Sequence, residues 1–400
     1  MMKTTTIFNN FKPVLPATDL SPARQREILR LFWRQPGLSR KELAKQLHCS
    51  LVSAGRYTDS LLAAGCLEEH NQTVTGPGCP PGALYLHSRL FLLAGLHFHD
   101  GDNITAVLLN TNGATLFRRT LTVPASTPAE AKVDSAIRLL EELLAAARVP
   151  PERLPGIGVA LTGISNPATG EVVNSFQFRD LRAPLPLRER LSRHFHKPCV
   201  LCNISHLLAW LEKRRGGAAG LDDFIYVHEG LGIGLYLNGR LYQGHQEGAG
   251  EFGLIQIARE SAPHPYDGRH GTLEILGGIN RLQKIYRAIR GPGWQFTDFL
   301  REVRQGDRQA IELLRDCYGY IARGVVNLAY LLNPEAIFLP PWTAEFPEYT
   351  LQVVQEAMEH YGNAGWGLRC AVQPAHCGDD QLPLGAAMLP MEYFFENELN

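Results

Sequence analysis

Apolar side chains recur at intervals of three and four residues in three short segments near the start of the chain, the spacing of an amphipathic helix. The first segment follows Ser21-Pro22, an N-cap with proline at the first helical position, and ends at Pro36-Gly37. The second follows Ser39-Arg-Lys-Glu42, the pattern of a capping box. The third runs from the N-cap Ser50 to Gly65. Its apolar positions are Val52, Ala54, Leu61 and Leu62.

The second and third predicted helices are joined by a tight turn at His48-Cys49, which is a helix-turn-helix pattern. A strand at 67–69, a loop rich in Gly and Pro over 76–82 and a strand at 83–86 then predict a wing. We therefore expect a winged helix-turn-helix domain over residues 1–88, with a double-stranded DNA operator as its partner. The side chains expected to face the bases are Ser50, Ser53, Arg56 and Tyr57, and those expected to face phosphates are Arg40, Lys41 and Lys45.

Charge supports an anionic partner for this part of the chain. The whole chain of 400 residues has a net charge of −1, but residues 1–87 hold 10 Lys or Arg and 6 Asp or Glu. The wing departs from this picture, because residues 71–87 contain neither Lys nor Arg, the residues that usually enter a minor groove. A three-helix unit used for protein contacts is therefore the alternative.

Beyond residue 90, strand-like and helical patterns alternate, which predicts an α/β body. Strands are expected at 92–96, 105–109 and 116–123, with a hairpin turn at Asn112-Gly113, and again at 156–161, 198–202, 224–227 and 233–237. Helices are expected at 128–148, 204–214, 308–332 and 381–398. The CxxC run from Cys199 to Cys202 falls in a strand, so we interpret it as core rather than as a redox or metal site.

Glycine-rich and acidic motifs of the body follow one another in a recognisable order. They are Gly156-Ile-Gly-Val, Asn203 after a strand, Gly230-Leu-Gly-Ile-Gly234, Gly248-Ala-Gly-Glu-Phe-Gly253, Gly271-Thr-Leu-Glu274, Leu332-Asn-Pro-Glu335 and Leu384-Gly-Ala-Ala387. In this order they resemble the ROK family of sugar kinases and repressors, and the helix-turn-helix resembles its transcriptional-regulator branch. The resemblance implies an actin-like body of two lobes: a smaller one over 89–200 with about 381–400, and a larger one over 201–380.

Three departures from the family's kinases concern phosphoryl transfer. The family's base is an Asp after an Asn, but here Ile204 follows Asn203 and cannot accept a proton. The first phosphate loop reads 97–102 His-Phe-His-Asp-Gly-Asp, which lacks the usual glycines, and Pro340-Pro341 replaces a Gly-Gly pair near the adenosine site. Only the second phosphate loop, at Gly230, is retained. We therefore expect no enzyme activity, no catalytic residue and no cofactor.

The family's zinc-binding pattern is also altered. Leu254 stands in place of the His, and Pro265, Asp267 and Thr272 stand in place of the three Cys. We expect no metal here, although His264, Asp267 and His270 leave another metal arrangement open.

The sugar-binding positions are retained. Asn203, Glu251 and Glu274 match the family's sugar-hydroxyl ligands, and Gly163 and Asn174 are expected to line the same cleft. Carboxylates beside an amide suit a polyol, because they accept hydrogen bonds from adjacent hydroxyls. Since Ile204 and Leu254 replace two polar sugar contacts, a deoxy sugar, an unusual sugar or no ligand at all stay open.

These observations predict a transcriptional regulator, with repressor as the expected sign, that senses a sugar or sugar derivative. The alternatives are a sugar kinase with a DNA-binding front end and a regulator controlled by a protein partner. Operators are usually two-fold symmetric, so a homodimer or tetramer is expected. The start of the chain lacks the apolar run of a secretory signal and no stretch is long enough to span a membrane, so we expect a cytoplasmic protein without a membrane partner.

Overall fold

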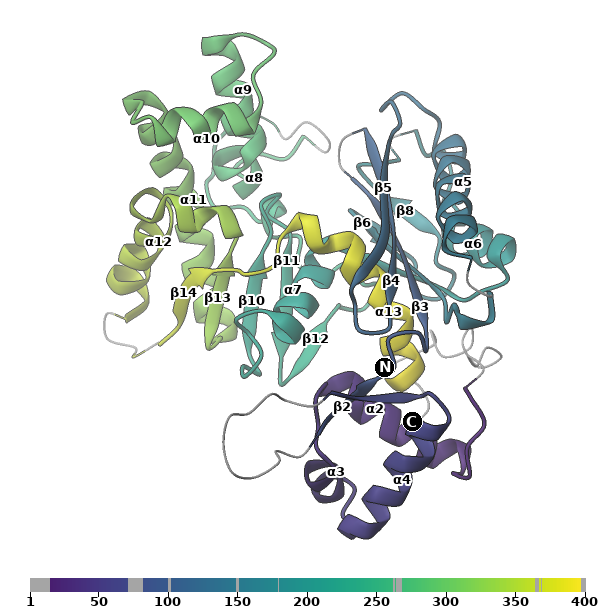
Figure 1. The fold of residues 1–400 in the computed structure, drawn as a ribbon. Coiled ribbons are helices and arrows are strands. Elements are labelled where there is room, and N and C mark those ends of the chain that lie inside the picture. Colours follow the sequence, from purple (N-terminus) through teal and green to yellow (C-terminus); the bar gives the residue numbers. More distant parts are fainter. Residues whose placement is uncertain are drawn as a thin grey trace. The chain divides into compact units, whose positions relative to one another are not determined.

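The computed structural model describes residues 15–70, 82–99, 102–148, 151–178, 180–261, 263, 268–363, 367 and 369–396. The chain divides into two compact units (Figure 1). The first comprises Met1–Cys202 together with Pro383–Asn400, and the second comprises Asn203–Leu382. The first unit holds both the predicted DNA-binding segment and the strands that follow it. The domain boundary near residue 88 stays a prediction.

The N-terminal part of the first unit is a bundle of three helices with a short hairpin. The helices are α2 (Pro22–Arg34), α3 (Arg40–Gln46) and α4 (Leu51–Ala63), and the hairpin pairs β1 (Leu67–His70) with β2 (Ala83–Leu86). Ile28, Leu29 and Phe32 of α2 are buried with Leu43 of α3 and Leu61 of α4. The apolar spacing therefore predicted both the helices and most of their core.

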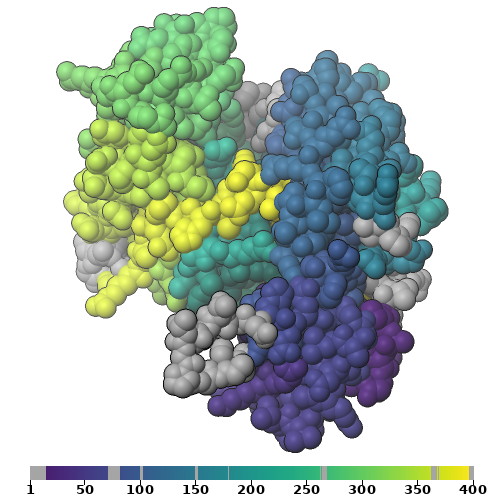
Figure 2. Space-filling model, viewed as in Figure 1, coloured from purple at the N-terminus to yellow at the C-terminus, as the bar shows by residue number. Residues whose placement is uncertain are grey.

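Within the first unit, this bundle packs against the C-terminal helix α13 (Leu382–Glu396). Trp33 Nε1 donates a hydrogen bond to Glu392 at 3.0 Å, and the Trp33 ring lies 6.1 Å from that of Phe395. The Arg26 guanidinium lies 5.0 Å from the ring of Phe394. In the space-filling view, the purple helices adjoin the blue strands that follow them in the same unit (Figure 2).

The first unit also contains a mixed five-stranded sheet of order β5-β4-β3-β6-β9. Its strands are β3 (Leu92–Phe98), β4 (Asn103–Asn110), β5 (Thr115–Thr122), β6 (Ile157–Leu161) and β9 (Cys199–Asn203). Helices α5 (Ala129–Ala147) and α6 (Leu187–Phe195) lie together on one side of it (Figure 1). On β3 and β6, Gly95 and Gly158 are paired in register, and Cβ atoms there would lie 2.3 Å from Pro383 O and 1.7 Å from Ala386 O. Glycine therefore lets α13 lie directly on the backbone of the sheet.

The second unit repeats the same strand order, as β12-β11-β10-β13-β14. Its strands are β10 (Phe224–Val227), β11 (Ile233–Leu237), β12 (Arg240–Tyr242), β13 (Ala336–Leu339) and β14 (Ala371–Pro374). In each sheet, three antiparallel strands are followed by a fourth strand that pairs in parallel. This duplication is the actin-like arrangement, so the predicted fold class is confirmed.

The second unit also contains several helices. They are α7 (Ile204–Arg215), α8 (Leu273–Gly277), α9 (Ile279–Arg290), α10 (Phe296–Arg304), α11 (Arg308–Leu332) and α12 (Leu351–Ala357). The longest, α11, buries an apolar stripe that includes Leu314, Ile321 and Val325. None of the described helices combines the length and the apolar composition needed to cross a membrane.

The strand β9 explains the CxxC run. Cys199 and Cys202 are both buried there, and the described residues contain no disulfide. Burial raises the pKa of the Cys199 thiol to about 12. A thiol kept neutral by burial is a poor nucleophile, and the burial of both side chains agrees with the interpretation of this pair as core.

Candidate functional site

N-caps set the geometry of the helix-turn-helix. Ser39 and Glu42 form the reciprocal capping box of α3, in which the Ser39 N–H donates to the Glu42 carboxylate at 2.8 Å. Ser50 caps α4 by accepting a hydrogen bond from the Ser53 N–H at 3.1 Å. Between the two helices His48 has a φ of 49°, so the chain reverses there in the left-handed region. The predicted starts of both helices are confirmed.

One face of α4 is buried and the opposite face is open. Ala54, Thr58 and Leu61 are buried, whereas Arg56 is exposed and Val52 is 83% exposed. The assignment of Val52 to the apolar side of this helix is therefore wrong. Residues two positions apart point about 200° apart on a helix, so Val52 cannot share a face with Ala54. A helical projection of the sequence would have placed Val52 beside Arg56 on the outer face.

The other predicted base-facing residues are more constrained. The hydroxyls of Ser50 and Ser53 lie 2.9 Å apart and share a hydrogen bond at the cap. Tyr57 is half-buried, with the guanidinium groups of Arg56 and Arg24 at 5.6 and 5.7 Å from its ring centre. Arg56 therefore has an aromatic support, and its exposed end carries the donors that can reach a base edge.

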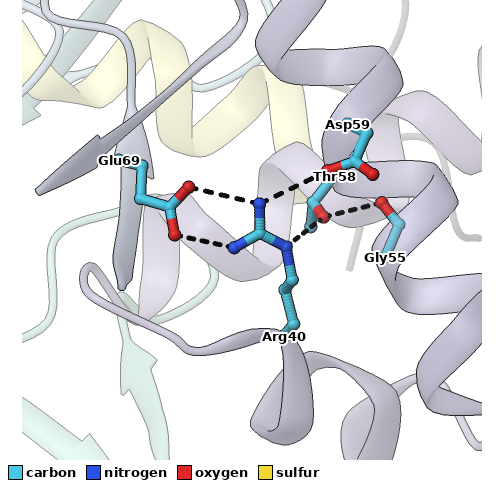
Figure 3. Close-up of polar contacts among 5 residues, drawn as sticks. All are labelled: Arg40, Gly55, Thr58, Asp59 and Glu69. Carbon is cyan, nitrogen blue, oxygen red and sulfur yellow. Dashed lines mark hydrogen bonds and ion pairs between the residues drawn. The ribbon is translucent and has the colours of Figure 1, made fainter. Parts of the chain in front are cut away.

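Arg40 occupies a polar network inside the domain (Figure 3). Its guanidinium donates to both carboxylate oxygens of Glu69, at 2.7 and 3.2 Å, and to Asp59 at 3.3 Å. Its Nε donates to Thr58 Oγ1 at 3.1 Å, and that hydroxyl donates in turn to the carbonyl of Gly55. Arg40 thus joins α3 to α4 and to the first strand of the wing.

This network differs from the expected phosphate contact of Arg40. The hydrogen bond to Glu69 is the largest cause that raises the pKa of Arg40, and the same bond lowers the pKa of Glu69. Lys41 and Lys45, on the same helix, are exposed, as their predicted role requires. The wing loop over residues 71–81 lies outside the described residues.

Two of the predicted ligand side chains of the second unit, Glu251 and Glu274, lie close to each other. Glu251 is exposed, yet partial burial of its carboxyl group and, after it, the charge of Glu274 raise its pKa. Glu274 stands in the first turn of α8, where it accepts a hydrogen bond from Asn280 Nδ2 at 3.1 Å. Two carboxylates 23 positions apart in sequence are therefore electrostatic neighbours.

Backbone contacts place the Glu251 loop. Gly250 has a φ of 103°, and a Cβ there would lie 2.1 Å from the Ile233 carbonyl, so only glycine fits. The Ile233 N–H donates to Gly250 O at 2.8 Å, and the Gly253 N–H donates to Leu231 O at 2.8 Å. His206 Nε2 lies 2.8 Å from the Ala249 carbonyl oxygen. The retained glycine loop at 230–234 thus serves as the support of the acidic loop.

Asn203 and Ile204 begin α7. The Asn203 side-chain oxygen accepts a hydrogen bond from the Ser205 N–H at 2.8 Å and so caps the helix. Ile204, at the position of the family's catalytic base, is 4% exposed and packs as a core residue. The Asn203 side chain therefore stabilises the start of α7, whether or not it also contacts a ligand.

The first unit holds the other two predicted ligand residues. Strand β7 (Ile164–Ser165) pairs with β8 (Val172–Asn174), and Ile164 is opposite Asn174. Gly163, with a φ of 110°, lies so close that a Cβ would be 2.1 Å from the Asn174 carbonyl oxygen. Gly163 and Asn174 are therefore neighbours, which is compatible with the prediction that both line one ligand cleft.

A small cavity lies in the second unit and is lined in part by Pro340, which the family resemblance places near the adenosine site. Its volume is about 20 Å³, and Glu229, Tyr318, Leu339, Pro340 and Trp342 are among its lining residues. The Trp342 indole N–H is buried and has no hydrogen-bond partner among the described residues. A cavity of this size has room for about one water molecule.

His228, Glu229 and Asp379 bring three potential metal ligands within 4.8 Å of one another. The hydrogen bonds of His228 do not suit a cation, however. Its Nδ1 accepts from the Gly230 N–H at 3.0 Å, which leaves the ring proton on Nε2, 2.9 Å from Asp379 Oδ1. That nitrogen is then a donor rather than a metal ligand. The pair ties the end of β10 to the segment before α13.

The altered zinc positions are only partly within the described residues. Pro265, Asp267 and His264 lie outside them. Thr272 is fully buried and its hydroxyl has no partner among the described residues, while His270 Nδ1 lies 2.7 Å from the Ser261 carbonyl oxygen. The loop is held by backbone pairing: the Leu273 N–H donates to Ile255 O at 3.0 Å, and the Ile257 N–H donates to Gly271 O at 2.8 Å.

Comparison with known proteins agrees with these motifs. The model of the ROK family matches residues 100–392. The xylose repressor of Bacillus subtilis is 20% identical over 382 residues, which cover 95% of this chain and 97% of that protein.

Two solved structures have the same fold. A ROK family transcriptional regulator, a homologue of the Escherichia coli MLC protein, has a TM-score of 0.75 and 20% identity, covering 94% of this chain and 96% of that one. A ROK family glucokinase from Streptomyces griseus, in complex with glucose and AMPPNP, has a TM-score of 0.63 and 22% identity. It covers 75% of this chain and 99% of its own. Repressors and kinases are thus both relatives of this chain.

Proposed function

This chain belongs to the ROK family, and we propose that it is a DNA-binding transcriptional repressor that senses a sugar or sugar derivative and has no kinase activity. We further propose that it acts in the cytoplasm as a homodimer or tetramer, because recognition helices about one DNA turn apart need two protomers. The observation that carries the proposal is the open outer face of α4, on a helix-turn-helix whose inner face is fully packed.

The DNA-binding half rests on the chemistry of that face. Arg56 presents guanidinium donors that suit the O6 and N7 acceptors of guanine, and Lys41 and Lys45 are exposed on the preceding helix, where they suit phosphates. Ser50, Ser53 and Tyr57 support the start of the reading helix and its arginine. Relatives that span nearly the whole chain are named repressors.

The sensing half rests on the acidic pair. Glu251 and Glu274 lie close enough for the charge of one to raise the pKa of the other. A polyol relieves this repulsion, because its hydroxyls donate to both carboxylates. Asn203, Gly163 and Asn174 complete the proposed ligand set. Since Ile204 is buried and apolar, a sugar that lacks one hydroxyl is the effector that this set favours.

The absence of kinase activity rests on two features. The base position holds a buried isoleucine, which cannot take a proton from the attacking hydroxyl. Pro340 and Pro341 stand where the family resemblance places a Gly-Gly pair near the adenosine, and neither proline has an N–H to offer a phosphate or ribose.

The test is fluorescence anisotropy of the full-length protein on DNA from upstream of its own gene. Binding is measured at two salt concentrations, with and without a panel of sugars and sugar phosphates. We expect sequence-preferring, salt-dependent binding that one sugar alters, and loss of that sugar's effect in Glu251→Gln.

Two controls complete this test. Arg56→Ala should weaken binding, whereas Arg308→Ala, an exposed arginine of the second unit, should leave it unchanged. A protein without preference for any upstream fragment would refute the DNA-binding half. ATP turnover with any sugar of the panel would refute the non-enzymatic half.

A further inference from the structure

The outer face of α4 begins with exposed apolar side chains. Val52, at 83%, is the most exposed large hydrophobic side chain in the described part of the chain, and its neighbour Leu51 is 59% exposed. Val52 contributes little to folding, because a side chain this exposed buries almost no apolar surface. Its place on the first turn of the reading helix is where a side chain that contacts bases is expected.

Charge around Val52 favours DNA as that partner. Arg56 lies one turn further on the same face, and Lys41 and Lys45 are exposed on the preceding helix. The first turn of α4 contains no acidic residue. Two acids lie further along this face: Asp59, seven positions after Val52, shares Arg40 with Glu69, and Asp19 accepts a hydrogen bond from the hydroxyl of Ser60.

The side chain also has space in front of it. Val52 and Arg56 line one open groove of about 820 Å³, together with Asp59, Ser60 and the segment Ala17–Asp19. The first residues of a recognition helix contact base edges in the major groove, and the apolar group exposed there is the 5-methyl group of thymine.

We infer that Val52 is a specificity-determining residue that reads the 5-methyl group of a pyrimidine in the major groove, beside the base pair that Arg56 contacts. This inference rests on the proposed DNA-binding function. Two bases carry the group, thymine and 5-methylcytosine, and the experiment separates them. A second copy of this chain is the competing occupant of the same face.

The experiment first selects bound duplexes from a random-sequence DNA library with the full-length protein. Each thymine of a selected duplex is then replaced singly by uracil, which removes only the methyl group. We expect wild-type affinity to fall about fourfold at one position per half-site, the worth of one buried methyl-sized group. In Val52→Ala the same replacement should have no effect, because the contact is already lost.

Two further arms make the test specific. Leu331→Ala, which truncates a side chain 78% exposed on α11, should keep the fourfold dependence. A cytosine placed at the sensitive position should bind better when it carries a 5-methyl group, in the wild type and not in Val52→Ala. Any change that uracil causes in DNA shape is common to the protein variants and cancels between them.

The outcomes are distinct. If duplexes are selected but no single uracil weakens binding, or Val52→Ala keeps the dependence, the inference is wrong and the DNA-binding function stands. If no duplex is selected, both fail. If Val52→Ala changes the oligomeric state of the protein without DNA, the face belongs to a second copy and the inference is overturned.

Discussion

Replacing Arg40 by alanine distinguishes a residue that supports the domain from one that binds phosphate. Arg40 makes a two-pronged ion pair with Glu69, in which the side chains are 30% and 32% exposed, and it adds a hydrogen bond to Thr58. Exposed ion pairs contribute about 0–1 kcal/mol and breaking a buried one costs about 3–5 kcal/mol, so we expect a loss of about 2 kcal/mol for this half-buried network. At that magnitude, the amides of α4 and β1 should exchange roughly thirtyfold faster.

The assay is hydrogen exchange on the full-length chain, combined with the salt dependence of DNA binding. Lys41→Ala, at the next position on the same helix, is the matched control. We expect Arg40→Ala to accelerate exchange and to leave the salt slope unchanged. Lys41→Ala should reduce the slope by about 0.9 and leave exchange unchanged, as loss of one phosphate contact requires. A reduced slope with unchanged exchange in Arg40→Ala would refute the structural role.

The pH dependence of this network follows from Glu69. Its pKa is lowered by the bond to Arg40, so its stabilising contribution is present above the ordinary glutamate pKa of about 4.3. That contribution is lost as the pH falls through the lowered value. Accordingly, acid should accelerate amide hydrogen exchange in α4 and β1 of the wild type. In Arg40→Ala the exchange of these amides should already be fast at neutral pH.

Three further predictions concern the body. The Glu251 carboxyl group should titrate by carbon-13 NMR with a midpoint above the ordinary value of about 4.3, and a midpoint below 4.3 would contradict the arrangement. Glu274→Gln should lower that midpoint but not to the ordinary value, because burial is the larger cause of the raised pKa. Since the folded pKa is raised, ionisation of Glu251 lowers the stability of the protein as the pH rises through that pKa. Ile204→Asp should not gain ATP turnover in a coupled ADP assay, because the altered loop at 97–102 and the pair Pro340-Pro341 still lack the backbone donors for a nucleotide, and measurable turnover would show otherwise. Gly158→Ala should lower stability by about 3 kcal/mol in thermal unfolding, because its Cβ would lie 1.7 Å from the Ala386 carbonyl, whereas Gly319→Ala, with open space around it, should not.

Local pattern predicted much of the fold. The three N-caps, the hairpin at Asn112-Gly113 and the strands on either side of Gly230 lie where the sequence places them, because capping, turn chemistry and apolar spacing act within a few residues. The retained motifs also predicted that Glu251 and Glu274 lie near each other. Sequence motifs carry such pairings because their order follows the order of elements in the family's fold.

The roles of individual side chains depended on tertiary structure. By residue type and position, Arg40 is a candidate phosphate contact. Its partner Glu69 lies 29 positions away in sequence, and the two side chains meet only when the wing folds against α3. His228 and Asp379 are 151 positions apart in sequence, and it is likewise the tertiary fold that brings them together.

By itself, the sequence predicted the helix-turn-helix and the alternation of strands and helices, since both depend on residue type and short spacing. The two-lobed body and the isoleucine at the base position were predicted from the order of the motifs that the chain shares with its family. Only the tertiary structure decided which charges are already paired and which valine faces outward. Those properties depend on burial and on contacts between distant segments, and a linear pattern does not specify them.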